Sequence, residues 1–168
     1  MNKIKIDLKV NNVNISKEVN ANTLLVDFLR YELKLTGTHV GCDTSQCGSC
    51  IVMMNNKCIK SCSVLLVQCN GSNISTVEGL GKEDKLHKIQ QTFKSNHGLQ
   101  CGFCTPGILF SALELSTYKN IKSDYQIREF LDGNLCRCTG YHNIVKSIKS
   151  YLNKENFKWK NLTITLLK

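Results

Sequence analysis

Cysteine is the residue that most constrains how this chain can fold, because it occurs ten times in 168 residues. Such a density indicates a disulfide framework, metal ligation or redox chemistry. The segment from Met1 to Val10 alternates lysine with apolar residues and lacks the apolar run and cleavage site of a secretory signal. We therefore expect a cytoplasmic protein whose cysteines are reduced and act as thiolate ligands. A disulfide-stapled secreted domain is the alternative.

The first set of cysteines has the spacing that holds a plant-type 2Fe-2S cluster. Its members are separated by four, two and eleven residues: Cys42, Cys47, Cys50 and Cys62. Three ligands from one tight loop can wrap the cluster while the fourth comes from an adjacent strand. Gly41 and Gly48 allow the backbone to approach closely, and its amides can then tune the reduction potential. Zinc is the alternative, although a four-residue gap fits paired zinc knuckles poorly.

The second set lies wholly in the later half of the chain and consists of two pairs: Cys101 with Cys104, and Cys136 with Cys138. Glycines and expected helix starts surround all four thiols. A one-residue gap between ligands is rare in zinc knuckles. Helix N-termini and backbone amides can partly offset the negative charge of four thiolates on two irons. Taken alone, this set favours iron less strongly than the first set does.

The remaining cysteines and the histidines carry no comparable pattern. We assign Cys58 and Cys69 to the structure, as small apolar side chains. A pair of histidine ligands would indicate a Rieske-type site, but no histidine pairs with the cysteine spacing. His39, close to Cys42 in sequence, is expected to be a surface or hydrogen-bonding residue. Because neither a nucleophilic triad nor a phosphate-binding glycine loop is visible, we expect no catalytic residue in this chain.

The formal net charge of +9 raises the question of nucleic-acid binding. Lysine and arginine are spread along the chain without a dense block before Lys154, and only 7% of residues are aromatic. We therefore expect a solvated basic surface, suited to an acidic protein partner, and no nucleic acid; a basic zinc protein that binds nucleic acid is the alternative. No run of 18 apolar residues is present, so no membrane span is expected.

The apolar pattern of the first part of the chain predicts a mixed α/β unit. Alternating or β-branched segments predict strands at 4–10, 13–19, 51–54 and 74–77. Asn11-Asn12 supplies the turn of the first hairpin, and a second Asn-Asn turn follows the third segment. Apolar residues with helical spacing between 24 and 33 predict one helix, which Gly37 is expected to end. Residues 41–50 form a loop.

Beyond about Glu78 the apolar period changes from two to roughly three and a half residues, which predicts helices. Four are readable, at 86–93, from 105 onward, at 127–131 and at 144–152. Gly98 is expected to end the first helix. The second begins at Pro106, where no amide donor is missed. Ser123 and Gln126 form a capping box for the third, and Gly133 ends it.

These patterns divide the chain into three parts. Residues 1–77 form the sheet-bearing domain and residues 78–155 the helical domain. Residues 156–168 have no clear period and are expected to be a docking tail or loose end. Each domain contains one of the two cysteine sets.

The motifs that contain these cysteines resemble those of one family, the small iron-sulfur subunits of molybdenum hydroxylases related to xanthine dehydrogenase and aldehyde oxidoreductase. The resemblance runs from Ile4 to about Leu152 and rests on Gly-Cys-Asp-Thr-Ser-Gln-Cys-Gly-Ser-Cys at 41–50, Ser-Cys at 61–62, Gln-Cys-Gly-Phe-Cys-Thr-Pro-Gly at 100–107 and Cys-Arg-Cys-Thr-Gly-Tyr at 136–141. It implies an α+β fold, with a ferredoxin-like β-grasp domain followed by a four-helix bundle. Each domain would bind one 2Fe-2S cluster.

The resemblance also implies partners. The helical-domain cluster would lie next to a molybdopterin (cytosine dinucleotide) cofactor in a large subunit, and the other cluster would face FAD in a medium subunit. Gln100 would hydrogen-bond the pterin, and Cys138 would be the ligand nearest to it. The whole would be a hetero-oligomer such as a dimer of heterotrimers, in which this chain is a non-catalytic electron-transfer subunit.

Three segments resemble the carbon monoxide dehydrogenase type within this family: Cys-Asp-Thr-Ser at 42–45, Val-Gln-Cys-Asn-Gly at 67–71 and His-Gly-Leu-Gln at 97–100. Many relatives have glycines where this chain has Thr44 and Ser45, so its loop is expected to be stiffer. Related aldehyde, nicotinate or purine hydroxylases remain alternatives, because the large subunit selects the substrate. A free-standing ferredoxin-like carrier is the alternative of a different class.

Overall fold

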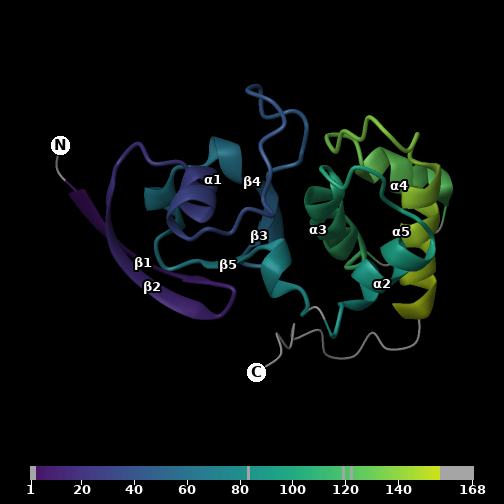
Figure 1. Cartoon of the computed structure of the whole chain (residues 1–168), viewed down its shortest axis with the longest axis horizontal. Coiled ribbons are helices and arrows are strands. Elements are labelled where there is room, and N and C mark those ends of the chain that lie inside the picture. Colours follow the sequence, from purple (N-terminus) through teal and green to yellow (C-terminus); the bar gives the residue numbers. More distant parts are fainter. Residues whose placement is uncertain (1–2, 83, 119, 122, 156–168) are drawn as a thin grey trace.

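The computed structural model describes residues 3–82, 84–118, 120–121 and 123–155. A sheet-bearing half and a helical half lie side by side, with helix α3 (Thr105–Leu115) of the helical half next to the sheet (Figure 1). The expected tail at 156–168 lies outside the described residues. The division at residue 77 stays a prediction; in the structure it falls in a short 3-10 turn, η4 (Val77–Gly79).

The sheet of the first half has five strands in the order β2-β1-β5-β3-β4. They are β1 (Lys3–Val10), β2 (Val13–Asn20), β3 (Ile51–Met54), β4 (Lys57–Lys60) and β5 (Asn73–Ser75). Only β1 and β5 pair in parallel. The two Asn-Asn turns at 11–12 and 55–56 have φ between 47 and 71°, which asparagine tolerates better than most residues. The strands predicted from alternation are therefore present, the last one shifted by one or two residues.

One short helix covers the sheet. It begins as α1 (Leu25–Asp27) and continues as a π-helical turn, η1 (Phe28–Glu32). Leu25, Phe28 and Leu29 are buried against strand residues such as Ile6 and Val52. The expected stop at Gly37 is wrong, because the chain leaves the helix at Leu33 and the left-handed residue that follows is Lys34, with φ of 60°.

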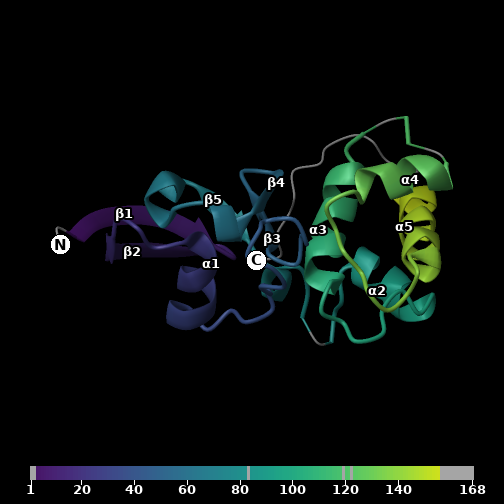
Figure 2. The same cartoon turned by 90° about the horizontal axis from the view of Figure 1, so that it is seen from above.

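The second half contains the four expected helices, α2 (Lys88–Ser95), α3 (Thr105–Leu115), α4 (Asp124–Phe130) and α5 (His142–Glu155). Both α3 and α5 contact α2 and α4, so each helix has two helical neighbours (Figure 2). Their apolar faces share one core that includes Phe93, Ile108, Ile127 and Ile148. The described helices include none that is long and apolar enough to cross a membrane.

The helix ends differ in detail from those expected. The capping box of Ser123 and Gln126 is confirmed. The turn that closes α2 uses His97, with φ of 53°, rather than Gly98. Pro106 is the second residue of α3 rather than the first. Helix ends depend on tertiary contacts: here a Cβ on Gly98 would meet Ser147 Oγ at 2.5 Å, so Gly98 makes room for α5 instead of turning the chain.

Two short 3-10 turns complete the first half, η2 (Ser61–Ser63) and η3 (Leu66–Cys69). The halves meet through a small apolar cluster of Ile51, Met53 and Phe110. Their backbones also touch, because a Cβ on Gly107 would lie 2.1 Å from the Gly48 carbonyl oxygen. This contact places the loop of the first cysteine set against the first turn of α3.

Candidate metal centres

The first cysteine set is assembled by the loop at 41–50 and the β3–β4 hairpin. Cys50 immediately precedes β3, and Cys62 lies in η2 directly after β4. Because Ile51 pairs with Lys60, the hairpin returns the chain to Cys50. The sulfur atoms of Cys50 and Cys62 are 3.3 Å apart. Cys62, which we predict to be the fourth ligand of this set, thus lies directly after an adjacent strand.

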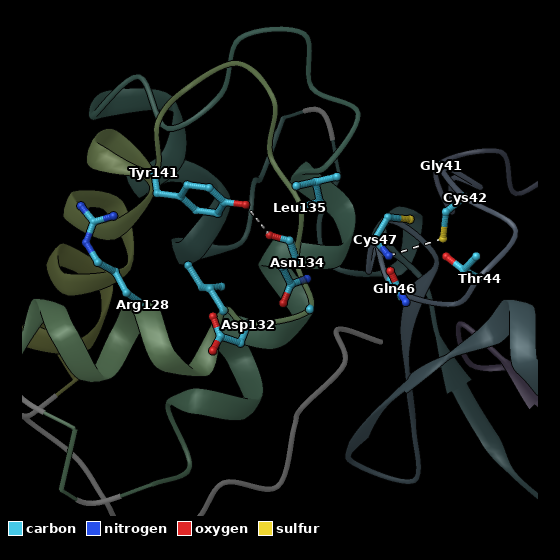
Figure 3. Close-up of a pocket in the computed structure, with 12 residues that line it drawn as sticks. Gly41, Cys42, Thr44, Gln46, Cys47, Arg128, Asp132, Asn134, Leu135 and Tyr141 are labelled. Carbon is cyan, nitrogen blue, oxygen red and sulfur yellow. Dashed lines mark hydrogen bonds between the residues drawn. The ribbon is translucent and has the colours of Figure 1, made fainter.

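The other two members of this set form a second pair. The Cys47 backbone N–H donates to the Cys42 sulfur at 3.4 Å, as Figure 3 shows. This N–H and its neighbours lower the pKa of Cys42 to about 6. Burial instead raises the pKa of Cys50 to about 12. A thiolate at Cys50 therefore needs a cation, such as a bound metal, to offset its desolvation.

The second set is assembled by the starts of two helices. Cys104 is the N-cap of α3, and Cys136 and Cys138 lie in the turn before α5. The sulfur atoms of Cys101 and Cys138 are 3.4 Å apart on the surface. Cys104 and Cys136 hydrogen-bond each other in the interior. This set therefore consists of one exposed pair and one buried pair.

Hydrogen bonds lower the pKa of two thiols of the second set, Cys136 and Cys101, whereas the pKa values of the other two are raised. Burial raises the pKa of Cys104 to about 12. For Cys136 burial acts in the same direction, but donors from Thr139 and the backbone N–H of Cys138 outweigh it, so the pKa of Cys136 is lowered. The Phe103 backbone N–H lowers the pKa of Cys101.

Thr139 and Tyr141 hold the turn that carries this set, a role that the sequence analysis missed because it considered only the thiols of that motif. The Thr139 hydroxyl is 3.1 Å from the Cys136 sulfur. The Tyr141 hydroxyl donates to the Asn134 carbonyl and accepts from the Cys136 N–H, at 2.9 and 2.8 Å. Figure 3 shows the hydrogen bond from Tyr141 to Asn134.

The sulfur atoms of each set lie in pairs. Within the described residues, no group of three or more His, Cys, Asp or Glu side chains is arranged to hold a metal ion. A 2Fe-2S cluster has two irons that share four thiolates, two on each. The sulfur pairs suit this chemistry.

Buried polar atoms give an independent test of this fit. Among the described side chains, two buried polar atoms have no hydrogen-bond partner: Thr105 Oγ1 and Asn134 Nδ2. Thr105 follows Cys104 directly. Asn134 Nδ2 is close to Gly48, the residue that follows Cys47: a Cβ on Gly48 would lie 2.9 Å from this nitrogen. Such atoms normally have partners, so both positions fit a sulfide-bearing group at each cysteine set.

A backbone hydrogen bond joins the two sets. The Leu135 backbone N–H, next to Cys136, donates to the Cys47 carbonyl at 2.8 Å. Beside this bond a cavity of about 500 Å³ is lined from both halves, by Cys42 and Gln46 on one side and by Asp132 on the other (Figure 3). Nothing in the local sequence indicated the Leu135 contact, which depends on packing between the halves.

Residues outside the sets behave mostly as expected. Cys69 is fully buried in the core of the first half. Cys58 is half-buried, and burial raises its pKa. His39 is a hydrogen-bonding residue: its Nδ1 contacts the Phe103 carbonyl at 2.8 Å, and the two rings stack at 4.5 Å. Gln100 is exposed, next to the exposed pair.

The comparisons with known proteins agree with this chemistry. Residues 8–75 match the family described as a 2Fe-2S iron-sulfur cluster binding domain, and residues 76–149 match the one described as a 2Fe-2S binding domain. Caffeine dehydrogenase subunit gamma from Pseudomonas sp. (strain CBB1) is 50% identical over 86% of this chain and 89% of that protein. The nicotine 6-hydroxylase small subunit of Paenarthrobacter nicotinovorans is 42% identical, over 87% of this chain and 88% of that protein.

A solved structure extends the likeness to the fold. The crystal structure of quinoline 2-oxidoreductase from Pseudomonas putida 86 matches with a TM-score of 0.85 and 38% identity, covering 90% of this chain and 94% of that chain. The fold is thus α+β with a ferredoxin-like 2Fe-2S half. Together with its matches to small subunits of multi-subunit enzymes, this shows that the chain belongs to the family of non-catalytic iron-sulfur subunits of molybdenum hydroxylases.

Proposed function

We propose that this chain is the electron relay of a molybdenum hydroxylase complex and that it holds one 2Fe-2S cluster in each half. The ligands in the ferredoxin-like β-grasp half would be Cys42, Cys47, Cys50 and Cys62. Those in the helical half, which we describe as a four-helix bundle, would be Cys101, Cys104, Cys136 and Cys138. When bound, such a cluster accepts and releases one electron at a time.

The Leu135 to Cys47 hydrogen bond is the observation that carries this proposal. It links the residue beside a helical-half ligand directly to a ligand of the other half, at 2.8 Å. Cys136, which neighbours Leu135, belongs to the buried pair, whereas Cys101 and Cys138 lie on the surface. The helical half therefore presents one pair of sulfurs to the outside and one toward the first half, as a relay requires.

We propose the electron direction and the partners that the family resemblance implies, and the exposure of Cys101 and Cys138 supports them. The exposed pair, with the exposed Gln100 beside it, would face the molybdopterin cytosine dinucleotide of a large subunit, with Cys138 nearest to the pterin. The first half would face FAD in a medium subunit. We propose a cytoplasmic hetero-oligomer such as a dimer of heterotrimers. The alternative carrier that acts alone would leave the exposed pair in solvent.

Metal analysis and spectroscopy of the anaerobically purified chain test the ligand sets. We expect about four iron and four sulfide per chain, and two distinct electron paramagnetic resonance (EPR) signals after reduction. Cys62→Ala should abolish one signal and Cys138→Ala the other, while Cys58→Ala, a control four residues before Cys62 in the sequence, should keep both. Zinc in place of iron, or loss of a signal in the control, would contradict the assignment.

Co-expression with the neighbouring genes tests the relay. We expect the chain to co-elute with a large and a medium subunit, and Gln100→Ala to slow reduction of the chain by substrate while leaving its iron content unchanged. A chain that elutes alone in size-exclusion chromatography would support the free carrier instead. An unchanged reduction rate in Gln100→Ala would remove the special role of that amide.

The substrate of the complex is a separate proposal. The sequence favours carbon monoxide dehydrogenase. The identity with proteins named for caffeine and nicotine favours a nitrogen heteroaromatic compound as a second candidate. Because the large subunit binds the substrate, reduction of the purified complex by carbon monoxide, caffeine or nicotine, measured as bleaching of its visible absorption, separates the two.

A further inference from the structure

Lys60 is the last residue of β4, two positions before Cys62. Its half-buried side chain turns back over the loop of the first cysteine set, and its Nζ donates to the Ser45 carbonyl at 2.7 Å. The Ser45 hydroxyl in turn lies 3.4 Å from the Cys62 sulfur. The ammonium group therefore lies against the segment that wraps the first site.

The same ammonium group also lies at the boundary with the helical half. A Cβ on Gly133 would be 3.5 Å from Lys60 Nζ. Gly133 precedes Asn134 and Leu135, the segment that contacts Cys47. Lys60 thus lies next to Ser45 and Gly133, each of which is two residues before one end of the Leu135 to Cys47 hydrogen bond.

No carboxylate neutralises this charge among the residues that the structure describes. The ion pairs there join Lys17 with Glu32 and Lys149 with Asp124, and neither involves Lys60. A carbonyl oxygen positions an ammonium group but does not cancel its charge. Because the side chain is half-buried, water and salt screen this charge less than they would on an exposed lysine.

An unneutralised cation at this place has a definite electrostatic consequence. Four thiolates and two sulfides on two ferric irons carry net negative charge, and reduction by one electron adds one more negative charge. A nearby positive charge stabilises the reduced form more than the oxidised form. It therefore raises the reduction potential of the group that it faces.

We infer that Lys60 sets the direction of the relay by raising the reduction potential of the first-half site relative to the helical-half site. This inference rests on the proposed function. In the step concerned, one electron passes from the iron pair on the helical-half thiolates to the iron pair on the first-half thiolates, and no bond forms or breaks. Lys60 is a positioning residue for this step, since it acts through its charge and through Ser45.

Three substitutions separate the charge of Lys60 from its hydrogen bond. Lys60→Arg keeps both, Lys60→Gln keeps a donor but removes the charge, and Lys60→Met removes both. Lys57→Met, at the exposed other end of β4, is the matched control. The readout is an EPR-monitored redox titration of the reduced chain, with the helical-half signal as internal reference.

We expect Lys60→Gln and Lys60→Met to shift the one-electron equilibrium between the two sites about tenfold toward the helical half, which corresponds to about 59 mV. Lys60→Arg and Lys57→Met should leave it unchanged. An unchanged equilibrium in Lys60→Gln would show that the side chain only stabilises the loop through its hydrogen bond, and would overturn the inference. So would an equal shift in Lys60→Arg and Lys60→Met.

Failure of this inference differs from failure of the proposed function. If the wild-type chain shows two EPR signals and Lys60→Gln leaves their relative potential unchanged, only the role of Lys60 is wrong. If the wild-type chain shows no pair of signals, the relay itself is wrong.

Discussion

Replacing Gly107 by alanine would test the contact that brings the two halves together. Gly107 lies in the first turn of α3, and its φ is not in the left-handed region. The built Cβ meets the backbone oxygen of Gly48 at 2.1 Å and the Ser49 Cα at 3.4 Å. The nearest clashing atom belongs to the main chain of the first cysteine loop, so no side-chain rotation can relieve the clash.

Two effects of this substitution have opposite signs. Alanine is favoured over glycine inside a helix by about 1 kcal/mol. Relief of the clash requires the loop and α3 to separate by about 1.4 Å, to a contact of about 3.5 Å, and overpacking of this kind costs about 1–3 kcal/mol. Because the clash is with backbone, we take the upper end and expect a net loss of about 2 kcal/mol. For a chain of this length, each kcal/mol lowers Tm by about 2–4 °C.

Thermal unfolding of the anaerobic iron-loaded chain measures this effect. Gly71→Ala is the control, because nothing lies within 4 Å of its Cβ and only its φ of 74° opposes the change. In Gly107→Ala we also expect weaker magnetic coupling between the two EPR signals, since the cysteine sets move apart. A higher Tm with unchanged coupling would mean that helix propensity dominates and that the halves do not depend on this contact.

Three further substitutions test single features of the fold. Ser123→Ala removes the confirmed capping box and should cost about 1 kcal/mol, measured by urea unfolding. Cys69→Ala should lower stability by about 1 kcal/mol without loss of iron, because this thiol only fills the core. His39→Ala removes both the hydrogen bond and the ring contact with Phe103 and should cost about 1–3 kcal/mol; an unchanged denaturation midpoint would show that the two cysteine loops are joined independently of His39.

Local patterns predicted the strands and helices of this chain well. The alternation on either side of Asn11-Asn12 requires a hairpin, because the strands' apolar faces must lie on one side. Ser123 and Gln126 likewise act within a single turn. Their capping box could be predicted because the glutamine follows the serine by three positions. In these cases the interacting groups are close in sequence.

The ends of elements were predicted less well, because they depend on distant residues. Gly98 was assigned a turn role from its type alone, whereas the structure uses it for close approach to α5 and turns the chain at His97. The helical spacing also did not indicate the π-helical turn after Asp27, in which Phe28 and Leu29 are buried in the core of the first half.

The cysteine spacing predicted the two sets but not their internal pairing. Spacing alone could not indicate that Cys101 is next to Cys138 on the surface while Cys104 meets Cys136 inside, because the pairing depends on how α3 and α5 pack. The same holds for the contacts of Leu135 and Lys60, which join segments far apart in sequence. Such contacts determine how the two cysteine sets are connected and which charged groups lie near them.

The separation of the two sets rests mainly on backbone contacts. Gly48 is in contact with both Gly107 and the Gly133 carbonyl, where a Cβ on Gly48 would come within 2.2 Å. Side chains in the apolar cluster of Ile51, Met53 and Phe110 can repack when they are exchanged, but two touching main chains cannot. It follows that the relay geometry depends on a few glycines rather than on the surrounding surface.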